Sequence, residues 1–174
     1  MPPSSARLHV VLVAPEIPWN SGNAGRTCLG AGAELHLVGP LGFSLDDRHL
    51  RRAGLDYWPR VRLSVWPGWE AFAAELPRLG EPFFFAARGR RLHWQVRYPE
   101  RAVLIFGSES VGLPPPLLAE HAERTVRIPM QDGALHSLNL STSVGIAVYE
   151  AWRQGEAGGA SPDDSVASPA PGSG

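Results

Sequence analysis

The chain of 174 residues contains one cysteine, Cys28, and no lysine, and it has no long hydrophobic run. A single cysteine excludes an internal disulfide and is typical of proteins in a reducing, cytosolic setting. No segment approaches the roughly 18–20 continuous apolar residues of a membrane span. Residues 1–7 also lack the apolar stretch of a signal peptide. We therefore expect a cytoplasmic protein without a membrane partner.

The motifs of several common enzyme classes are also missing. There is no Gly-x-x-x-x-Gly-Lys of a P-loop, and no Gly-x-Gly-x-x-Gly follows the first predicted strand. The Gly-x-Ser-x-Gly elbow of serine hydrolases is absent as well. The six histidines are scattered, without a His-x-x-x-His pair or a second cysteine, so we expect no metal site.

Positive charge, histidine aside, comes only from sixteen arginines, and the formal net charge is −1. The arginines form two clusters, one of Arg48, Arg51 and Arg52 and one of Arg88, Arg90 and Arg91. Guanidinium groups suit bidentate contacts with phosphate. Composition alone leaves two readings open, because such clusters are either phosphate-binding sites or ordinary solvated surface charges.

Apolar runs and helical spacings alternate along the chain. The apolar runs predict strands over residues 8–14, 34–38, 61–65, 83–86, 102–106 and 125–128. We expect helices from 20 to about 32, around 69–76, over 117–121 and over 139–154, a short helix from 46, and a basic exposed loop over 87–94. This order predicts an α/β fold with a mostly parallel sheet covered by helices on both faces.

The last predicted helix is apolar around most of its circumference. One stripe comprises Leu140, Val144, Ala147, Val148 and Ala151, and a second apolar group comprises Ile146, Tyr149 and Trp152. Such a helix is either central or at an oligomer interface, and we favour a dimer interface that includes Tyr149. Gly145 costs about 1 kcal/mol relative to alanine, which a close helix–helix approach would explain. Residues 155–174 are poor in large apolar side chains, so we expect one domain over 1–154 and a disordered tail.

Three loops that follow predicted strands combine glycine with polar residues. The first holds Asn20 and Arg26, the second runs from Gly107 to Pro114, and the third from Met130 to Ser141. Each alone is compatible with ordinary turn chemistry. Ligands in open α/β sheets bind at the carboxyl ends of strands, so together the loops predict one composite binding site. We expect Glu109 to act there as an orienting hydrogen-bond acceptor rather than as a general acid.

The three loops resemble the motifs of the SPOUT RNA methyltransferases. Asn20-Ser21-Gly22-Asn23-Ala24-Gly25-Arg26 is similar to the first motif, Phe106-Gly107-Ser108-Glu109-Ser110-Val111-Gly112-Leu113-Pro114 to the second, and Ile128-Pro129-Met130 with Ser137-Leu138-Asn139-Leu140-Ser141 to the third. The most similar subgroup is the small tRNA wobble-position 2′-O-methyltransferase family of the TrmL type. The resemblance covers roughly residues 8–154.

The resemblance implies a deep trefoil knot at the C-terminal end of the sheet and a homodimer packed through the first and last helices. It also implies S-adenosylmethionine (AdoMet) as the cofactor, in contact with Phe85, Gly107, Ile128 and Ser137, with Ala86, Glu109, Met130 and Leu138 as near neighbours. The implied activity is 2′-O-methylation of the ribose of tRNA nucleotide 34, a cytidine or a uridine-type nucleotide.

Similar enzymes use the arginine of the first motif, here Arg26, at the methyl-transfer step. Since a guanidinium is effectively never deprotonated, we expect Arg26 to hold the neighbouring phosphate and to stabilise alkoxide charge. His136 stands where arginine is common in the family, which bears on RNA selectivity. We expect His136 and the two arginine clusters to contact phosphates of the tRNA anticodon stem-loop.

Two alternatives remain at this point. One is a SPOUT 2′-O-methyltransferase for another tRNA or rRNA nucleotide, and the other is a non-catalytic RNA-binding protein of the same fold. We expect no separate RNA-binding domain before residue 8, which disfavours the larger subgroups. The intact Arg26 and third motif disfavour a protein without activity.

Overall fold

The computed structural model describes residues 6–45 and 57–157. Its strands are β1 (Leu8–Val13), β2 (Glu34–Val38), β3 (Leu63–Trp66), β4 (Glu81–Phe85), β5 (Arg91–Leu92), β6 (Ala102–Phe106) and β7 (Thr125–Arg127). Its helices are α1 (Pro18–Gly30), α3 (Trp69–Leu79), α4 (Pro115–Glu120) and α5 (Leu140–Ala157), with 3-10 turns η1 (Trp58–Arg60) and η2 (Ala122–Arg124). The short helix predicted from residue 46 lies outside the described residues, as do Arg48, Arg51 and Arg52.

The described strands form one seven-stranded sheet in the order β3-β2-β1-β6-β4-β7-β5, and all their pairings are parallel. This confirms the predicted α/β class, and all six predicted strands are present. The prediction of an uninterrupted loop over 87–94 is wrong, because Arg91 and Leu92 pair with Val126 and Arg127. A strand of two residues has no apolar run of its own, so the pairing with β7 defines it.

Two helices begin at prolines that precede the predicted helix starts at residues 20 and 117. The structure starts α1 at Pro18 and α4 at Pro115, in each case earlier than predicted. Proline lacks a backbone N–H, but the first-turn N–H groups of a helix have no partner within the helix. Proline at these positions therefore costs the helix no hydrogen bond.

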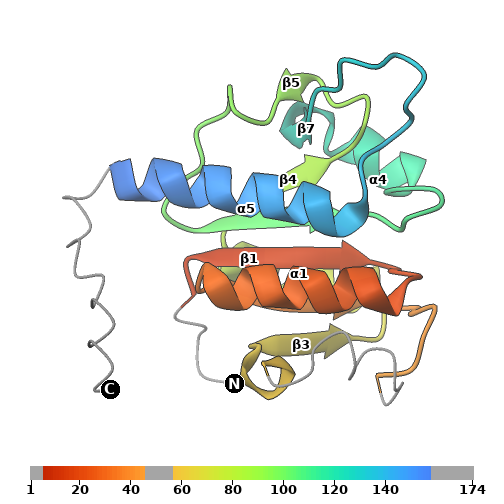
Figure 1. The fold of residues 1–174 in the computed structure, drawn as a ribbon, viewed down its shortest axis with the longest axis vertical. Helices are drawn as coiled ribbons and strands as arrows, with labels where there is room; N and C mark the ends of the chain where they lie inside the picture. The colour runs from red at the N-terminus through yellow and green to blue at the C-terminus, as the bar shows by residue number, and fades with distance from the viewer. Residues whose placement is uncertain (1–5, 46–56, 158–174) are drawn as a thin grey trace, which may run out of the picture.

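Helices cover both faces of the sheet (Figure 1). On one face α1 and α5 lie side by side, while α3 and α4 pack against the other face. Side chains alternate along a strand, so Leu8, Val10 and Leu12 of β1 join one core and Val11 and Val13 join the other. The central strands thus need apolar residues at nearly every position, which is why they appear as continuous apolar runs in the sequence.

Helix α5 has the two apolar faces that the sequence predicts. The stripe from Leu140 to Ala151 is buried, whereas Ile146, Tyr149 and Trp152 are exposed. The helix continues to Ala157, beyond its predicted end at residue 154, and residues 158–174 lie outside the described part of the chain. Over residues 6–45 and 57–157, no helix combines the length and the apolar character needed to cross a membrane.

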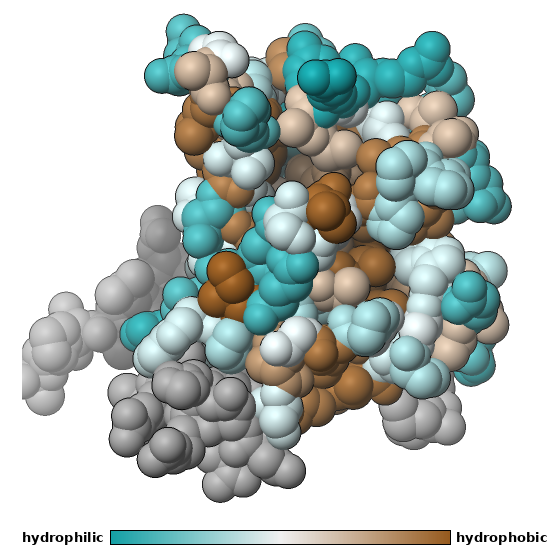
Figure 2. All heavy atoms as spheres, turned by 90° about the vertical axis from the view of Figure 1, so that its right-hand side faces the viewer, coloured by the Kyte–Doolittle hydropathy of each residue, from teal (hydrophilic) through white to brown (hydrophobic). Residues whose placement is uncertain are grey.

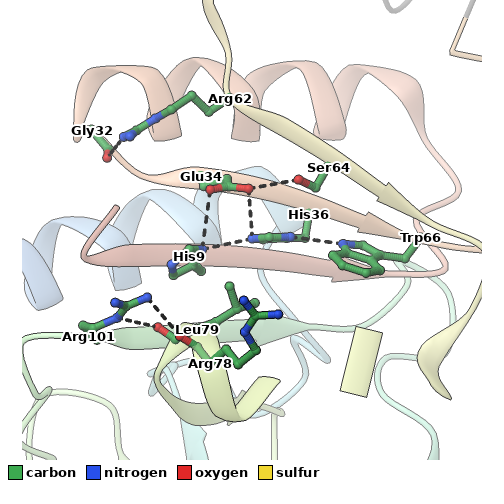
Figure 3. A network of polar contacts seen from close by, with 10 residues as sticks. All are labelled: His9, Gly32, Glu34, His36, Arg62, Ser64, Trp66, Arg78, Leu79 and Arg101. Carbon is green, nitrogen blue, oxygen red and sulfur yellow. Dashed lines mark hydrogen bonds and ion pairs between the residues drawn. The ribbon is translucent and has the colours of Figure 1, made fainter. Parts of the chain in front are cut away.

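A buried polar network joins the first three strands (Figure 3). The indole Nε1–H of Trp66 donates to Nδ1 of His36 at 3.1 Å, and Nε2 of His36 lies 3.0 Å from Nδ1 of His9. Since the indole can only donate, Nδ1 of His36 is the unprotonated nitrogen, and Nε2 of His36 carries the proton toward His9. Glu34, held by a 2.9 Å hydrogen bond from Ser64, lies beside both imidazoles.

The same grouping resembles a metal site in composition. His9, Glu34 and His36 place possible ligand atoms within 4.8 Å of one another. A neutral histidine that binds a metal through Nε2 keeps its proton on Nδ1. At His36 that proton would face the indole N–H of Trp66, so the hydrogen-bond pattern favours a proton-shared network over metal ligation.

The network predicts acid sensitivity of the fold. Burial lowers the pKa of His36 to about 4 and also lowers the pKa of His9. The unfolded imidazoles take up protons near their ordinary pKa of 6.5, so the unfolded state binds more protons than the folded state between pH 6.5 and 4. The free energy of unfolding should be highest above pH 6.5 and fall as the pH drops toward 4.

Urea unfolding at a series of pH values measures this effect. The variant His36→Gln removes the titrating group, and its unfolding free energy should depend less steeply on pH in the same window. Parallel pH profiles for the two proteins would contradict the assignment.

Candidate functional site

The predicted composite site lies at the carboxyl edge of the sheet. Strands β1, β6, β4 and β7 are neighbours, and the loops that follow them meet at this edge. They surround a cavity of about 680 Å³, within the usual range for small-molecule sites. Figure 2 looks onto this edge and shows brown apolar surface between teal polar side chains. The cavity is lined by all eight predicted cofactor residues: Phe85, Ala86, Gly107, Glu109, Ile128, Met130, Ser137 and Leu138.

A tight backbone turn forms one wall of the cavity. Ser108 and Gly112 form an isolated antiparallel bridge, and the Gly112 N–H donates to the Ser108 carbonyl at 3.0 Å. Gly112 has a φ of +73°, a conformation that favours glycine. At Gly107, a Cβ atom would overlap the backbone of Gly112 and Leu113. These two glycines therefore allow the loop to fold back onto the end of β6.

An aromatic pair supplies the apolar part of the wall. Phe85 ends β4 and Phe106 ends β6, and their rings stack with centroids 4.5 Å apart. Both rings line the cavity, together with Ile128 just after β7. The three strand ends thus present apolar surface suited to a flat, apolar part of a ligand, while the loops contribute backbone polar groups.

Glu109 is the centre of a hydrogen-bond network between the first and second loops. Its carboxylate accepts hydrogen bonds from the backbone N–H groups of Glu16 at 2.7 Å and Ile17 at 3.1 Å. It also accepts a hydrogen bond from the side-chain amide of Asn20 at 3.0 Å. The predicted role of Glu109 as an orienting acceptor agrees with these contacts. The carboxylate also lies at the N-terminal end of α1, where the helix dipole favours negative charge.

The carboxylate of Glu16 makes a second contact between the same two loops. Glu16 accepts hydrogen bonds from the backbone N–H of Ser110 at 2.9 Å and from its hydroxyl at 2.6 Å. The sequence alone assigned no role to Glu16 or to Ser110. The partners are 94 positions apart, and both belong to loops that are ordinary in composition. Only the tertiary structure pairs them into what we call the double clasp, formed by Glu16, Glu109 and Ser110.

Asn20 extends the network to the third loop. Its side-chain oxygen accepts a hydrogen bond from the amide of Asn139 at 3.0 Å. Asn139 in turn caps α5, because its side-chain oxygen accepts from the backbone N–H of Ser141 at 2.9 Å and of Thr142 at 3.3 Å. One buried asparagine therefore links the starts of the two helices that share a face of the sheet.

The predicted RNA-binding residues are not all gathered at the cavity. Arg88 and His136 line it and are exposed. Arg90 pairs with the carboxylate of Glu123, and Arg91 donates to the Glu123 carbonyl at 3.1 Å. These two arginines therefore hold η2 against the β5 segment, so the cluster divides into a cavity residue and two residues that bind η2.

Arg26 lies apart from the cavity of its own chain. It is exposed on α1, and its guanidinium carbon sits 5.3 Å from the ring centroid of Tyr57. The Tyr57 hydroxyl donates to the Gly22 carbonyl at 3.2 Å. Arg26 is not among the residues that line the cavity, so within one chain it does not reach the predicted cofactor site.

A second, larger cavity of about 850 Å³ lies at the opposite edge of the sheet. It is bordered by the start of β1 and by the C-terminal ends of α1 and α5. Several of its arginines already have partners: Arg7 pairs with Glu100 at 3.5 Å, and Arg153 pairs with Glu150 at 2.9 Å. It contains none of the three loop motifs, so size alone does not mark the functional site.

The fold and the arrangement of the loops define an RNA methylase architecture. Residues 7–149 match the SpoU rRNA Methylase family, and the chain belongs to that family. An AdoMet-bound rRNA methyltransferase from Sinorhizobium meliloti has a similar structure, with a TM-score of 0.77 and 27% sequence identity. That alignment covers 88% of this chain and 58% of the other.

Within the family, the chain has more similar relatives. A tRNA (cytidine(34)-2'-O)-methyltransferase of Burkholderia ambifaria is 48% identical over 155 residues, which cover 87% of this chain and 99% of that protein. A solved structure described as "Structural insights into the 2-OH methylation of C/U34 on tRNA" has a TM-score of 0.81 and 48% identity. It covers 87% of this chain and 97% of the other.

Proposed function

We propose that this protein transfers a methyl group from AdoMet to the ribose 2′-hydroxyl of the wobble nucleotide of tRNA, a cytidine or a uridine-type nucleotide at position 34. The observation that carries this proposal is the single cavity formed by all three sequence motifs. The relatives at 48% identity over nearly their whole length support the choice of substrate. A cytoplasmic location follows from the proposed substrate.

The residues of the cavity fit AdoMet. The stacked pair Phe85 and Phe106 suits the adenine ring, and the close backbone turn at Gly107 brings main-chain donors and acceptors near a ligand. Ser137 and Glu109 add polar groups at the rim. When bound, AdoMet supplies the methyl group, whose bond to sulfur breaks as the bond to the 2′-oxygen forms.

The acceptor hydroxyl is a poor nucleophile until its proton leaves. We assign Arg26 the task of holding the neighbouring phosphate and of stabilising negative charge as it develops on the 2′-oxygen. The proton passes to that phosphate or to water, because a guanidinium is already fully protonated. Arg26 has the exposure that contact with RNA requires.

A homodimer packed through α1 and α5 would bring Arg26 to the cavity of the other subunit. Apolar surface on both helices supports this assembly. Ile146, Tyr149 and Trp152 expose apolar surface on α5, the rings of Tyr149 and Trp152 meet edge to face at 5.4 Å, and Trp19 is exposed on α1. A Cβ at Gly145 would meet open space within the chain, so a second subunit would explain the glycine.

The path of the chain supports a knot. The segment between β4 and β6 crosses β7 so closely that a Cβ at Gly89 would overlap the backbone at Val126. The segment then returns over α5, where Gln154 accepts from the Tyr98 N–H at 3.0 Å and donates to the Val96 carbonyl at 3.1 Å. The chain from β7 to α5 would pass through the loop that this segment forms.

Binding of the anticodon stem-loop is assigned to Arg88 and His136 at the cavity, to Arg90 and Arg91 beside η2, and to Arg48, Arg51 and Arg52. Contacts with phosphate release counterions, so the affinity for tRNA should decrease steeply as salt concentration increases.

The single domain over residues 1–154 remains a prediction.

Mapping of the methylated nucleotide tests the proposal. The protein would be incubated with AdoMet and either unmodified tRNA or ribosomal RNA, and the products digested and analysed by mass spectrometry. We expect one 2′-O-methyl group at nucleotide 34 and none without AdoMet. Methylation elsewhere in tRNA or in ribosomal RNA would favour another member of the family, and AdoMet binding without any product would contradict the assigned activity.

A further inference from the structure

The mouth of the cavity has an unusual apolar rim. Val111 is 83% exposed, and Ile17 is 42% exposed, yet both line the same cavity as the predicted cofactor residues. An apolar side chain that is almost entirely in water contributes little to folding. Val111 is such a residue, and Ile17 in the lining of the same cavity is partly exposed, so the apolar surface at this entrance is better explained by contact with a ligand than by core packing.

The double clasp holds these two residues in place. Ile17 follows Glu16 and donates its own N–H to Glu109, while Val111 follows Ser110. Val111 is further fixed by its backbone N–H, which lies 3.4 Å from the Ser108 hydroxyl. The side chains are thus exposed on a backbone that is tied at both ends. A surface fixed in this way loses little conformational freedom when a ligand binds.

The opposite side of the mouth carries the guanidinium of Arg88 and the imidazole of His136. Ile17 and Val111 come from the loops after β1 and β6, whereas Arg88 and His136 come from the loops after β4 and β7. The strand order places β1 and β6 on one side of the cavity and β4 and β7 on the other. One half of the entrance therefore presents exposed apolar side chains, beside the carboxylates of Glu16 and Glu109 that backbone N–H groups hold, and the other half presents the cation of Arg88.

We propose that Ile17 and Val111 form a platform for the base of the nucleotide whose ribose is methylated, with its phosphate on the side of Arg88 and His136. This inference rests on the proposed function. A nucleotide carries a flat base, whose faces suit apolar contacts although its edges are polar, and an anionic phosphate on either side of its ribose. The two halves of the entrance match these groups, and this orientation directs the ribose toward the cofactor cavity between them.

Substitution of Val111 tests the platform. Because the side chain is exposed, Val111→Ser should fold normally, which a thermal melt would check. We expect the KM for tRNA to rise about five- to tenfold, with kcat and the AdoMet dissociation constant within twofold of the unchanged protein. Val111→Leu keeps an apolar surface and should retain a normal KM. Val65→Ser, at an exposed apolar position on β3, serves as the matched control and should change nothing.

Each other outcome contradicts the platform. An unchanged KM in Val111→Ser would show that the base does not contact this residue. A parallel loss of AdoMet affinity would indicate a structural role in the cofactor loop, and a change in oligomeric mass would assign the rim to a subunit contact. If the proposed function itself were wrong, the result would be different, because the unsubstituted protein would then not methylate tRNA at nucleotide 34.

Discussion

Replacement of Arg26 by alanine is expected to abolish methyl transfer while leaving AdoMet binding intact. Arg26 does not line the cofactor cavity of its own chain, and at the partner's cavity its assigned contact is with an RNA phosphate, so its loss should remove no contact with AdoMet. If it stabilises charge on the 2′-oxygen and holds the adjacent phosphate, its removal acts on the transition state. Loss of one such group typically lowers kcat by about 10²–10³-fold.

Single-turnover methyl transfer to tRNA measures the chemical step, and calorimetry measures AdoMet affinity. Arg26→Lys keeps the charge but lacks the planar fork, so its rate should be closer to that of the alanine variant than to that of the unchanged protein. Arg60→Ala removes another exposed arginine and controls for the loss of surface charge. A rate for Arg26→Ala within tenfold of the unchanged protein would contradict the assigned role.

Arg26 also contacts Tyr57 through a cation–π interaction, which contributes about 0.5–1 kcal/mol at an exposed site. The alanine variant should therefore melt only slightly below the unchanged protein. Such a small difference separates a catalytic defect from misfolding. Separate measurements at saturating tRNA would show whether the defect lies in kcat, as a group acting in the transition state requires.

Replacement of Gly107 by alanine should have a large effect of a different kind. The added Cβ would overlap the backbone of Gly112 and Leu113, which cannot move aside as a flexible side chain could. Overpacking of this sort typically costs about 1–3 kcal/mol or more. The loop must shift away from the end of β6, and the cavity wall shifts with it. We expect both a lower melting temperature and the loss of measurable AdoMet binding.

Thermal unfolding and calorimetry on the same preparation would test this prediction. For a domain of this size, 1 kcal/mol corresponds to a change in melting temperature of about 2–4 °C. Gly133→Ala is the matched control, because a Cβ there would meet open space in a loop that also borders the site. Normal AdoMet affinity in Gly107→Ala would mean that the close turn at Gly107 does not shape the cofactor site.

The strands and the chemical character of the site could be predicted well because each rests on local residues. The run Ala102–Phe106 is apolar throughout because β6 is buried on both faces, and its pattern identifies it without any partner. The glycines at 107 and 112 likewise mark the turn that follows. The eight cofactor residues were implied by the resemblance to the SPOUT enzymes, and all of them line one cavity, since parallel strands bring their carboxyl ends to one edge.

Contacts between distant segments could not be predicted in this way. The clasp of Glu16 with Ser110 spans 94 positions, and the pairing of His9 with His36 spans 27. Neither residue of either pair has a neighbour in sequence that signals its partner. The two-residue strand β5 is a further example, because only the pairing of Arg91 and Leu92 with β7 makes these residues a strand.

The sequence by itself determined the alternation of strands and helices, the burial of the central strands and the three loops that carry the site, because periodicity and turn chemistry are local properties. Only the tertiary structure decided that Asn20 joins the three loops, that Arg26 lies outside the cavity of its own chain, and that Val111 stands exposed at its mouth. The physical reason is that burial, hydrogen-bond partners and access depend on which segments the folded sheet brings together.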